Sequence, residues 1–130
     1  MSYQKTIMVV DDNLDILNIA RAVLEGEGYK VICACSGTEV FRQLEEQKPD
    51  LIVLDIMLPN MDGLEVLRRL KADPDTSSIP VMMLTVKGHY DDIRLAYEVG
   101  CDYYLTKPFT GKQIVDVVNR LLSQTRRAPD

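Results

Sequence analysis

Four positions in the chain carry polar residues of the kinds that bind metals and phosphate, and each comes at or near the end of a short apolar run. They are the pair Asp11 and Asp12, then Asp55, Thr85 and Lys107. Two carboxylates about 5 Å apart repel each other by roughly 3 kcal/mol at an effective dielectric constant of about 20. If the three aspartates meet, a hard divalent cation such as Mg²⁺ or Mn²⁺ would relieve this repulsion, because such ions prefer oxygen ligands. With an ammonium group and a hydroxyl group added, the set is typical of a site that handles phosphoryl groups.

Each of these groups has its own task in phosphoryl chemistry. Asp55 would be the nucleophile, since a carboxylate can form an acyl phosphate. A Mg²⁺ ion held by Asp11 or Asp12 would shield the incoming charge. Lys107 would pair with one phosphoryl oxygen, and Thr85 would donate a hydrogen bond to another. Taken singly, each residue has an ordinary explanation as a turn, a cap or a loop residue, so the hypothesis depends on all four positions coming together.

The segments before these residues are predicted to be buried strands. Short apolar runs lie at residues 7–10, 29–34, 51–54, 81–84 and 103–105. Near-continuous runs of this length indicate strands that are buried on both faces. Apolar residues then recur at helical spacing at residues 14–24, 40–44, 64–70, 93–97 and 114–122. Asn13 and Ser36 are candidate N-caps of the first two helices, and Gly100 is a candidate C-cap of the fourth.

This alternation of strands and helices predicts an α/β fold, with a doubly wound five-stranded parallel sheet and helices on both faces. In the flavodoxin-like strand order 2-1-3-4-5 the first and third strands are neighbours. Asp11, Asp12 and Asp55 would then meet at the carboxyl edge of the sheet, where such folds bind ligands. The chain of 130 residues has room for one domain. We expect that domain to span residues 1–123, with residues 124–130 as a tail or the start of a linker to an effector domain.

Composition narrows the range of partners. The net charge of −5 and the pI of about 4.9 argue against direct binding of this chain to nucleic acid or to an anionic membrane. The sequence has no secretory leader pattern and no apolar stretch long enough to span a membrane, so we expect a cytoplasmic protein. Cys33 and Cys35 lie in an apolar segment and are expected to pack in the core rather than bind metal. The methionines are expected to pack in the core or in loops, namely Met57, Met61, Met82 and Met83.

Stretches of this sequence resemble, in order, the signatures of the receiver domains of two-component response regulators, the family that includes the chemotaxis regulators. The stretches are residues 10–13, residues 55–63, Thr85 and residues 104–109, and the resemblance covers residues 5–123. It implies that Asp55 is the phosphoacceptor. It further implies that Mg²⁺ is bound by Asp11, Asp12, Asp55 and the backbone carbonyl of Met57.

The resemblance also assigns roles to residues near the ends of the fourth and fifth strands. Thr85 and Tyr104 would be switch residues, and Lys107 would contact the phosphoryl group. The peptide bond between Lys107 and Pro108 would be cis, a form that is common only before proline.

A protein of this family would act as a phosphoacceptor signalling switch. It would receive its phosphoryl group from a sensor histidine kinase, a phosphotransfer protein or a small phosphodonor. It would catalyse only its own phosphorylation and autodephosphorylation. The change would be read on the face formed by the fourth helix, the fifth strand and the fifth helix, which controls a partner or an output domain. Formation of a homodimer on phosphorylation is a further expectation of this kind.

Some positions depart from the commonest family pattern. Val86 stands where a small residue is usual and would narrow access to Asp55. Tyr103 removes a charge from the region through which one receiver subfamily dimerises. Met57 and Lys87, two residues after Asp55 and Thr85, offer neither an amide nor a carboxylate to position an attacking water, which predicts slow autodephosphorylation.

Three other interpretations of these residues remain as alternatives. A phosphatase of the haloacid-dehalogenase type needs a second aspartate two residues after the nucleophile, where this chain has Met57. A flavin or nucleotide binder needs a phosphate loop rich in glycine, serine or threonine after the first strand, where this chain has Asp11 and Asp12. The third alternative is a receiver that has lost its chemistry and serves only as an interaction module.

Overall fold

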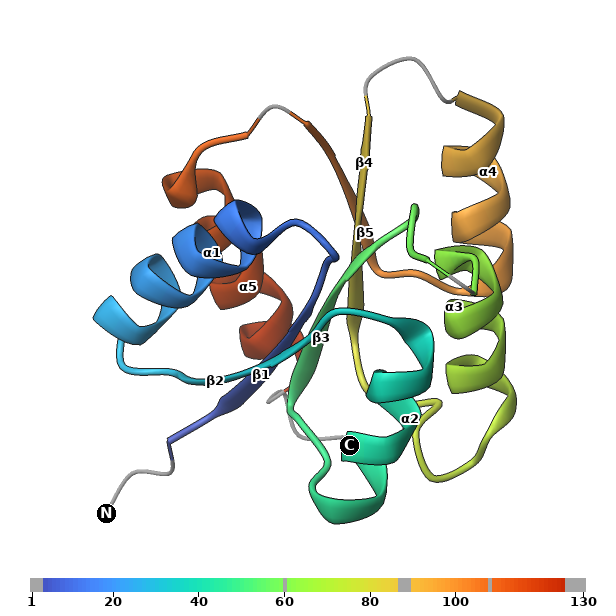
Figure 1. The fold of residues 1–130 in the computed structure, drawn as a ribbon, viewed down its shortest axis with the longest axis horizontal. Helices are drawn as coiled ribbons and strands as arrows, with labels where there is room; N and C mark the ends of the chain where they lie inside the picture. The colour runs from blue at the N-terminus through green and yellow to red at the C-terminus, as the bar shows by residue number, and fades with distance from the viewer. Residues whose placement is uncertain (1–3, 60, 87–89, 108, 126–130) are drawn as a thin grey trace.

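The computed structural model describes residues 4–59, 61–86, 90–107 and 109–125, and in these residues strands alternate with helices (Figure 1). The strands are β1 (Thr6–Val10), β2 (Lys30–Ala34), β3 (Leu51–Asp55), β4 (Val81–Val86) and β5 (Tyr103–Lys107). The helices are α1 (Leu14–Gly26), α2 (Gly37–Glu46), α3 (Gly63–Ala72), α4 (Tyr90–Val99) and α5 (Gly111–Thr125). Every strand and helix that the sequence predicts is therefore present. Within the described residues, no helix is both long and apolar enough to cross a membrane.

All the strands belong to one parallel sheet with the order β2-β1-β3-β4-β5, as predicted. Helices α1 and α5 cover one face, and α2, α3 and α4 cover the other (Figure 1). The chain runs from β1 outward to β2 and then crosses back past β1 to β3. This reversal brings the carboxyl ends of β1 and β3 together at the point in the strand order where such a sheet usually binds ligands.

The inner strands β1 and β3 are buried on both faces because both faces of the sheet are covered by helices. Successive residues of β1 enter different cores, since side chains alternate across a strand. Met8 and Val10 pack in the core beneath α2, α3 and α4, whereas Ile7 and Val9 pack in the core beneath α1 and α5. All four side chains are fully buried. This two-sided burial is the reason that the strands appear in the sequence as continuous apolar runs.

Polar caps and a glycine set the helix ends that lie nearest the strands. The side chain of Asn13 accepts hydrogen bonds from two backbone N–H groups in the first turn of α1, at 2.9 and 3.3 Å. Ser36 accepts one from the first turn of α2 at 3.2 Å. Gly100 follows α4 with φ of +127°, and its N–H donates to the carbonyl of Ala96 at 3.0 Å. The three predicted caps are therefore confirmed.

Strands β3, β4 and β5 extend further than their apolar runs indicated. Asp55 is the last residue of β3, Thr85 lies inside β4, and Lys107 is the last residue of β5. Pairing continues into these polar residues because ladder hydrogen bonds are made by the backbone, with Thr85 opposite Thr106 and Val86 opposite Lys107. Asp55, Thr85 and Lys107 are thus positioned by the sheet itself, whereas Asp11 and Asp12 lie just beyond the end of β1.

Candidate functional site

Three aspartates meet at the carboxyl edge of the sheet, as predicted. Asp11 directly follows β1, Asp12 comes next, and Asp55 ends the neighbouring strand β3. One carboxylate oxygen from each of the three lies within 4.8 Å of the others. Asp11 is fully buried and Asp55 is 3% exposed, whereas Asp12 is exposed. The cluster is therefore a largely buried acidic pair with a third carboxylate at its mouth.

Backbone hydrogen bonds fix the two buried carboxylates in place. The N–H of Asp11 donates to the carbonyl of Ala34 at 3.1 Å, so that the pairing with β2 extends to the site. The Oδ1 atom of Asp11 accepts from the N–H of Asn13 at 2.9 Å. The Oδ1 atom of Asp55 accepts from the N–H of Met57 at 3.1 Å. Each carboxylate is thus held by the chain that leaves its own strand, in a turn typical of aspartate.

The end of β3 is also in close contact with the start of α3. The N–H of Gly63, the first residue of α3, donates to the carbonyl of Ile56 at 2.9 Å. A Cβ atom added to Gly63 would lie 2.3 Å from the carbonyl oxygen of Asp55 and 2.6 Å from the Cα atom of Ile56. Only a residue without a side chain can therefore pack against the peptide of Asp55 at this point.

Lys107 supplies a positive charge to the acidic pair. Its Nζ atom lies 3.2 Å from Oδ2 of Asp55 and 3.4 Å from Oδ2 of Asp11, and it donates a hydrogen bond to both. Burial works against the charged amine, but the carboxylates of Asp55 and Asp11 outweigh it and raise the pKa of Lys107 above its ordinary value. The lysine therefore remains an ammonium group at neutral pH, bridging β1 and β3 from the end of β5.

One lysine does not balance the cluster. Burial is the main reason that the pKa of Asp11 rises from 3.8 to about 6; the Asn13 N–H lowers it, the Asp55 charge raises it, and the Lys107 charge lowers it. Three carboxylates and one ammonium group leave two negative charges at pH 7, which is the charge that a divalent cation neutralises. The donors are carboxylate oxygens, the ligands that Mg²⁺ prefers. The residues present therefore fit such an ion.

Thr85 and Tyr104 lie on the side of the sheet that faces α4. In the sheet register Tyr104 pairs with Met83, and Thr85 lies two residues beyond Met83 on the same strand. Because side chains alternate along a strand, all three share one face, while Asp55 is opposite Leu84 of the other core. Thr85 is 1% exposed and Tyr104 is 9% exposed. Thr85 and Tyr104 therefore share one face of the sheet, and Thr85 is the one of the two that lies closer to the carboxyl edge.

Two predictions about sulfur-containing residues were wrong. Cys35 is exposed, with its thiol 3.7 Å from a carboxylate oxygen of Glu39, because it lies just beyond the last residue of β2. The side chain of Met57 is 60% exposed. Cys33 packs against the core beneath α1 and α5, as expected.

Met82 and Met83 are in the core and Met61 packs against it, as expected. The predictions for Lys87 and Pro108 concern residues outside the described part of the chain, and the side chain of Val86 lies outside it as well.

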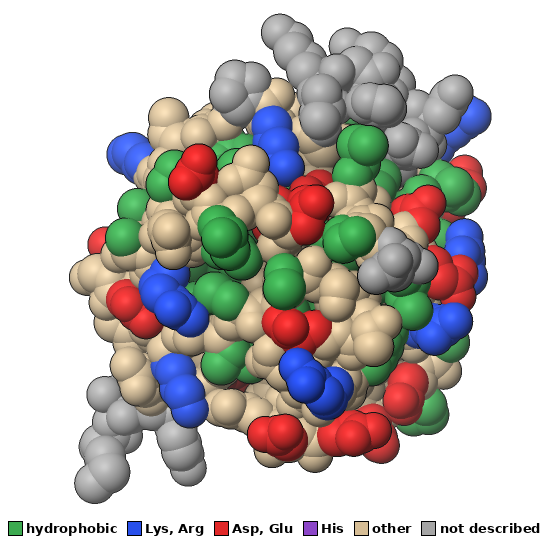
Figure 2. Space-filling view, in the orientation of Figure 1, with side chains coloured by type: hydrophobic (Ala, Val, Ile, Leu, Met, Phe, Trp, Pro, Cys, Tyr) green, Lys and Arg blue, Asp and Glu red, His purple; other side chains and the backbone are tan. Residues whose placement is uncertain are grey.

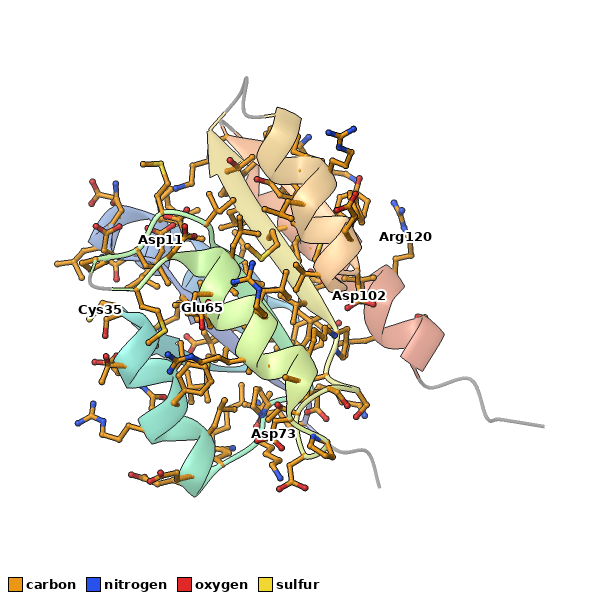
Figure 3. The ribbon with its side chains drawn as sticks, turned by 90° about the vertical axis from the view of Figure 1, so that its right-hand side faces the viewer. Asp11, Cys35, Glu65, Asp73, Asp102 and Arg120 are labelled. Atoms are coloured by element: carbon orange, nitrogen blue, oxygen red, sulfur yellow. The ribbon has the colours of Figure 1, made fainter. Side chains whose placement is uncertain are left out.

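The site occupies one end of the molecule, and two exposed apolar side chains lie close to the acidic cluster in sequence. Figure 3 shows Asp11 near the loop that enters α3 and Asp73 at the opposite end of that helix. Leu14, at the start of α1, is 69% exposed and adjoins the acidic cluster in sequence, as Met57 does. Elsewhere, on the face shown in Figure 2, acidic, basic and apolar side chains are interspersed. Leu14 begins the apolar helical pattern of residues 14–24, so its exposure departs from the burial that this pattern predicts.

Comparison with known proteins gives a consistent result. Residues 7–119 match the family model described as the response regulator receiver domain. The alkaline phosphatase synthesis transcriptional regulatory protein PhoP of Bacillus subtilis is 41% identical over 124 residues, which are 95% of this chain and 51% of that protein. The chain spans about half the length of the curated relatives that it matches first.

Solved structures agree in fold as well as in sequence. A response regulator from Chloroflexus aurantiacus J-10-fl superposes with a TM-score of 0.89 at 33% identity, covering 93% of this chain and 99% of that one. The phosphorylated cyanobacterial phytochrome response regulator RcpA superposes with a TM-score of 0.85 at 30% identity, covering 98% of this chain and all of that one. With its strand order, its acidic cluster and these matches, the chain belongs to the receiver domain family of two-component response regulators.

Proposed function

We propose that this receiver domain accepts a phosphoryl group on Asp55, with Mg²⁺ held by Asp11, Asp12, Asp55 and the backbone carbonyl of Met57. The observation that carries the proposal is the position of Lys107. Its ammonium group lies within 3.4 Å of both buried carboxylates, next to a third, exposed carboxylate. An ammonium group that bridges two buried carboxylates at the strand ends can also bind an oxyanion beside them. This favours a phosphoryl-binding role for Lys107 over a purely structural one.

In the reaction, a carboxylate oxygen of Asp55 attacks the phosphorus atom of the donor and forms a new P–O bond. The bond from phosphorus to the donor nitrogen or oxygen breaks, and its electron pair leaves with the donor. A bound divalent cation would supply charge neutralisation at the phosphoryl oxygens. Lys107 is placed to transfer its hydrogen bond from Oδ2 of Asp55 to a phosphoryl oxygen as the carboxylate charge is lost. The N–H of Met57 keeps the carboxyl group oriented during the attack.

The proposed phosphoryl donors are those of the receiver domain family. A phosphohistidine of a sensor histidine kinase or phosphotransfer protein, or a small acyl phosphate, would supply the group. The exposed side chains of Leu14 and Met57 offer apolar contacts to a protein donor at the rim of the site. The chain would turn over no separate substrate, so its catalysis is limited to gaining and losing its own phosphoryl group.

The signal would leave the site through Thr85 and Tyr104. A phosphoryl group on Asp55 adds up to about two negative charges, which attract a neighbouring hydroxyl group. Movement of Thr85 toward it would make room on the face that Thr85 shares with Tyr104. The surface of α4, β5 and α5 would then change and control a partner, an output domain or a second copy of the chain.

The output is proposed from the relatives. The PhoP relative is named as a transcriptional regulatory protein, and it is about twice as long as the matched region. We therefore propose that residues 1–123 form the receiver unit and that residues 124–130 lead toward an effector domain. Any contact with DNA would belong to that effector, since this chain carries a net charge of −5.

The proposal is tested by incubating the protein with acetyl phosphate and Mg²⁺ and measuring intact mass. Wild type should gain one phosphoryl group with Mg²⁺ and none when EDTA is present during the incubation. The Asp55→Asn variant should gain none in either case. The Asp50→Asn variant is a matched control, because Asp50 precedes β3 at the opposite edge of the sheet. Equal phosphorylation of wild type and Asp55→Asn would show that Asp55 is not the acceptor.

A further inference from the structure

Two tyrosine rings contact each other between α4 and β5. The ring centroids of Tyr97 and Tyr104 are 6.5 Å apart, with an angle of 40° between the planes. Tyr104 is 9% exposed and Tyr97 is 47% exposed. Tyr104 is therefore the inner ring of the pair, and Tyr97 is the outer ring.

The backbone holds this pair in a fixed relation. Only residues 100–102 separate α4 from β5. The N–H of Cys101 donates to the carbonyl of Ala96 at 3.0 Å and closes the end of the helix. Asp102 is tied to β4, because its N–H donates to the carbonyl of Val81 at 2.8 Å and its carboxylate accepts from the N–H of Val81 at 2.8 Å. The helix thus cannot move far from the strand without breaking these bonds.

A polar contact accompanies the ring contact. The backbone of Tyr104 makes a hydrogen bond to the phenol oxygen of Tyr97. Burial raises the pKa of the Tyr97 phenol, and this hydrogen bond opposes the rise. Tyr97 is therefore attached to the residue beside it through both its ring and its hydroxyl group.

We propose that Tyr97 is a positioning residue that holds the ring of Tyr104 in its buried position, on the face of the sheet that carries Thr85. This inference rests on the proposed function, in which phosphorylation draws Thr85 toward Asp55 and makes room for the Tyr104 ring on the face that the two residues share. An aromatic pair shifts an equilibrium between two ring positions by about two- to tenfold. If only the form with the buried ring is phosphorylated, a contact that favours the buried ring raises the rate of phosphorylation of Asp55 by up to the same factor. Tyr97 would thus set how easily this receiver is activated.

The first test needs no phosphorylation. Full-length chains with ¹³C-labelled tyrosine rings are compared by NMR, and the Tyr104 signal is assigned from a Tyr104→Phe spectrum. Tyr97→Ala should move the Tyr104 ring signal toward that of free tyrosine, because it uncovers the inner ring. Tyr97→Phe keeps the ring and should restore most of the wild-type position. Leu95→Ala is the matched control, since it truncates another exposed apolar residue of the same helix.

The second test measures the rate of phosphorylation by acetyl phosphate with Mg²⁺ in the same variants. Tyr97→Ala should be slower than wild type by about two- to tenfold, with Tyr97→Phe between them and Leu95→Ala like wild type. An unchanged Tyr104 signal in Tyr97→Ala, or equal changes in Tyr97→Ala and Leu95→Ala, would overturn the proposal. If no variant and no wild type takes a phosphoryl group, the proposed function fails, while the ring signals still decide the role of Tyr97.

Discussion

Replacement of Gly63 by alanine tests how tightly the phosphoacceptor strand is held. The new Cβ atom would lie 2.3 Å from the carbonyl oxygen of Asp55, 2.6 Å from the Cα atom of Ile56 and 2.8 Å from its carbonyl oxygen. All three atoms are backbone, so no side chain can rotate away. A normal contact requires a displacement of about 1 Å, and it must come from α3 or from the end of β3.

The cost can be judged from what that displacement disturbs. The N–H of Ile56 donates to the carbonyl of Leu84 at 2.9 Å, and the N–H of Gly63 donates to the carbonyl of Ile56 at 2.9 Å. Overpacking in a tight core costs about 1–3 kcal/mol, and strained backbone hydrogen bonds add to it. We expect Gly63→Ala to lower the free energy of unfolding by about 3 kcal/mol.

Two other glycines give matched controls for the same chemical change. A Cβ atom on Gly37 would meet Cγ2 of Val66 at 2.9 Å and side-chain atoms of Met61 at 3.0 Å, which can give way, so a loss of about 1 kcal/mol is expected. A Cβ atom on Gly26, at the end of α1, has nothing within 4 Å. Gly26→Ala should therefore stabilise the protein by about 0.5–1 kcal/mol through helix propensity.

Stability is measured by urea unfolding monitored by circular dichroism. Phosphorylation by acetyl phosphate is measured separately, without urea. Gly63→Ala should also phosphorylate more slowly than Gly37→Ala, because only the first displaces the peptide of Asp55. A Gly63→Ala variant within about 0.5 kcal/mol of wild type would refute the argument from close approach. So would the same loss of stability in all three variants.

Three further predictions concern the carboxylates, the rim and the thiols. In EDTA, Asp11→Asn should be more stable than wild type by up to about 3 kcal/mol at pH 8 and by about half that at pH 5. The pKa of Asp11 is raised from 3.8 to about 6 in the folded protein, so wild type loses stability as the pH rises through 6 and the carboxyl group ionises, whereas the amide does not ionise. A difference in the free energy of urea unfolding that does not depend on pH would contradict this. Met57→Asn should shorten the lifetime of phosphorylated Asp55, since it adds an amide that can position water at an exposed place beside the acceptor. The decay is followed by intact mass over time, and an unchanged or slower decay would contradict this role of the amide. A maleimide should label exposed Cys35 quickly and Cys101 slowly, because burial raises the pKa of the Cys101 thiol to about 12; peptide mapping that finds Cys101 labelled first would reverse the assignment.

Much of the fold could be predicted because its signals are local. The run at residues 7–10 is apolar at every position, since β1 is covered on both faces, and Asn13 marks the start of α1 by its side chain alone. The strand ends were harder to place. Thr85 and Lys107 are polar, so the apolar pattern stops before them, while backbone pairing carries β4 and β5 past them. The apolar sequence pattern therefore ends before the backbone pairing does, at the carboxyl ends of the strands that carry the site.

The members of the acidic cluster could be predicted, but the differences among them could not. Asp11 and Asp12 are adjacent and chemically alike, yet one is fully buried and the other is exposed. That difference follows from the direction of the chain as it leaves β1 and from the hydrogen bond that Asn13 donates back to Asp11. The contact between Tyr97 and Tyr104 was equally hidden, because it depends on how α4 is rotated about its axis against β5.

The position of Lys107 at the end of the last strand has a consequence for synthesis on the ribosome. Domains are made from the N-terminus, and residues 6–86 include four of the five strands, with β1 and β3 as neighbours. Asp11 and Asp55 can therefore meet in the nascent chain before Lys107 has been translated. Until it emerges, the two carboxylates can be balanced by a cation from the surroundings or by a proton on Asp11, whose pKa burial raises to about 6. The order of translation thus couples closure of this sheet to the ions around the growing chain.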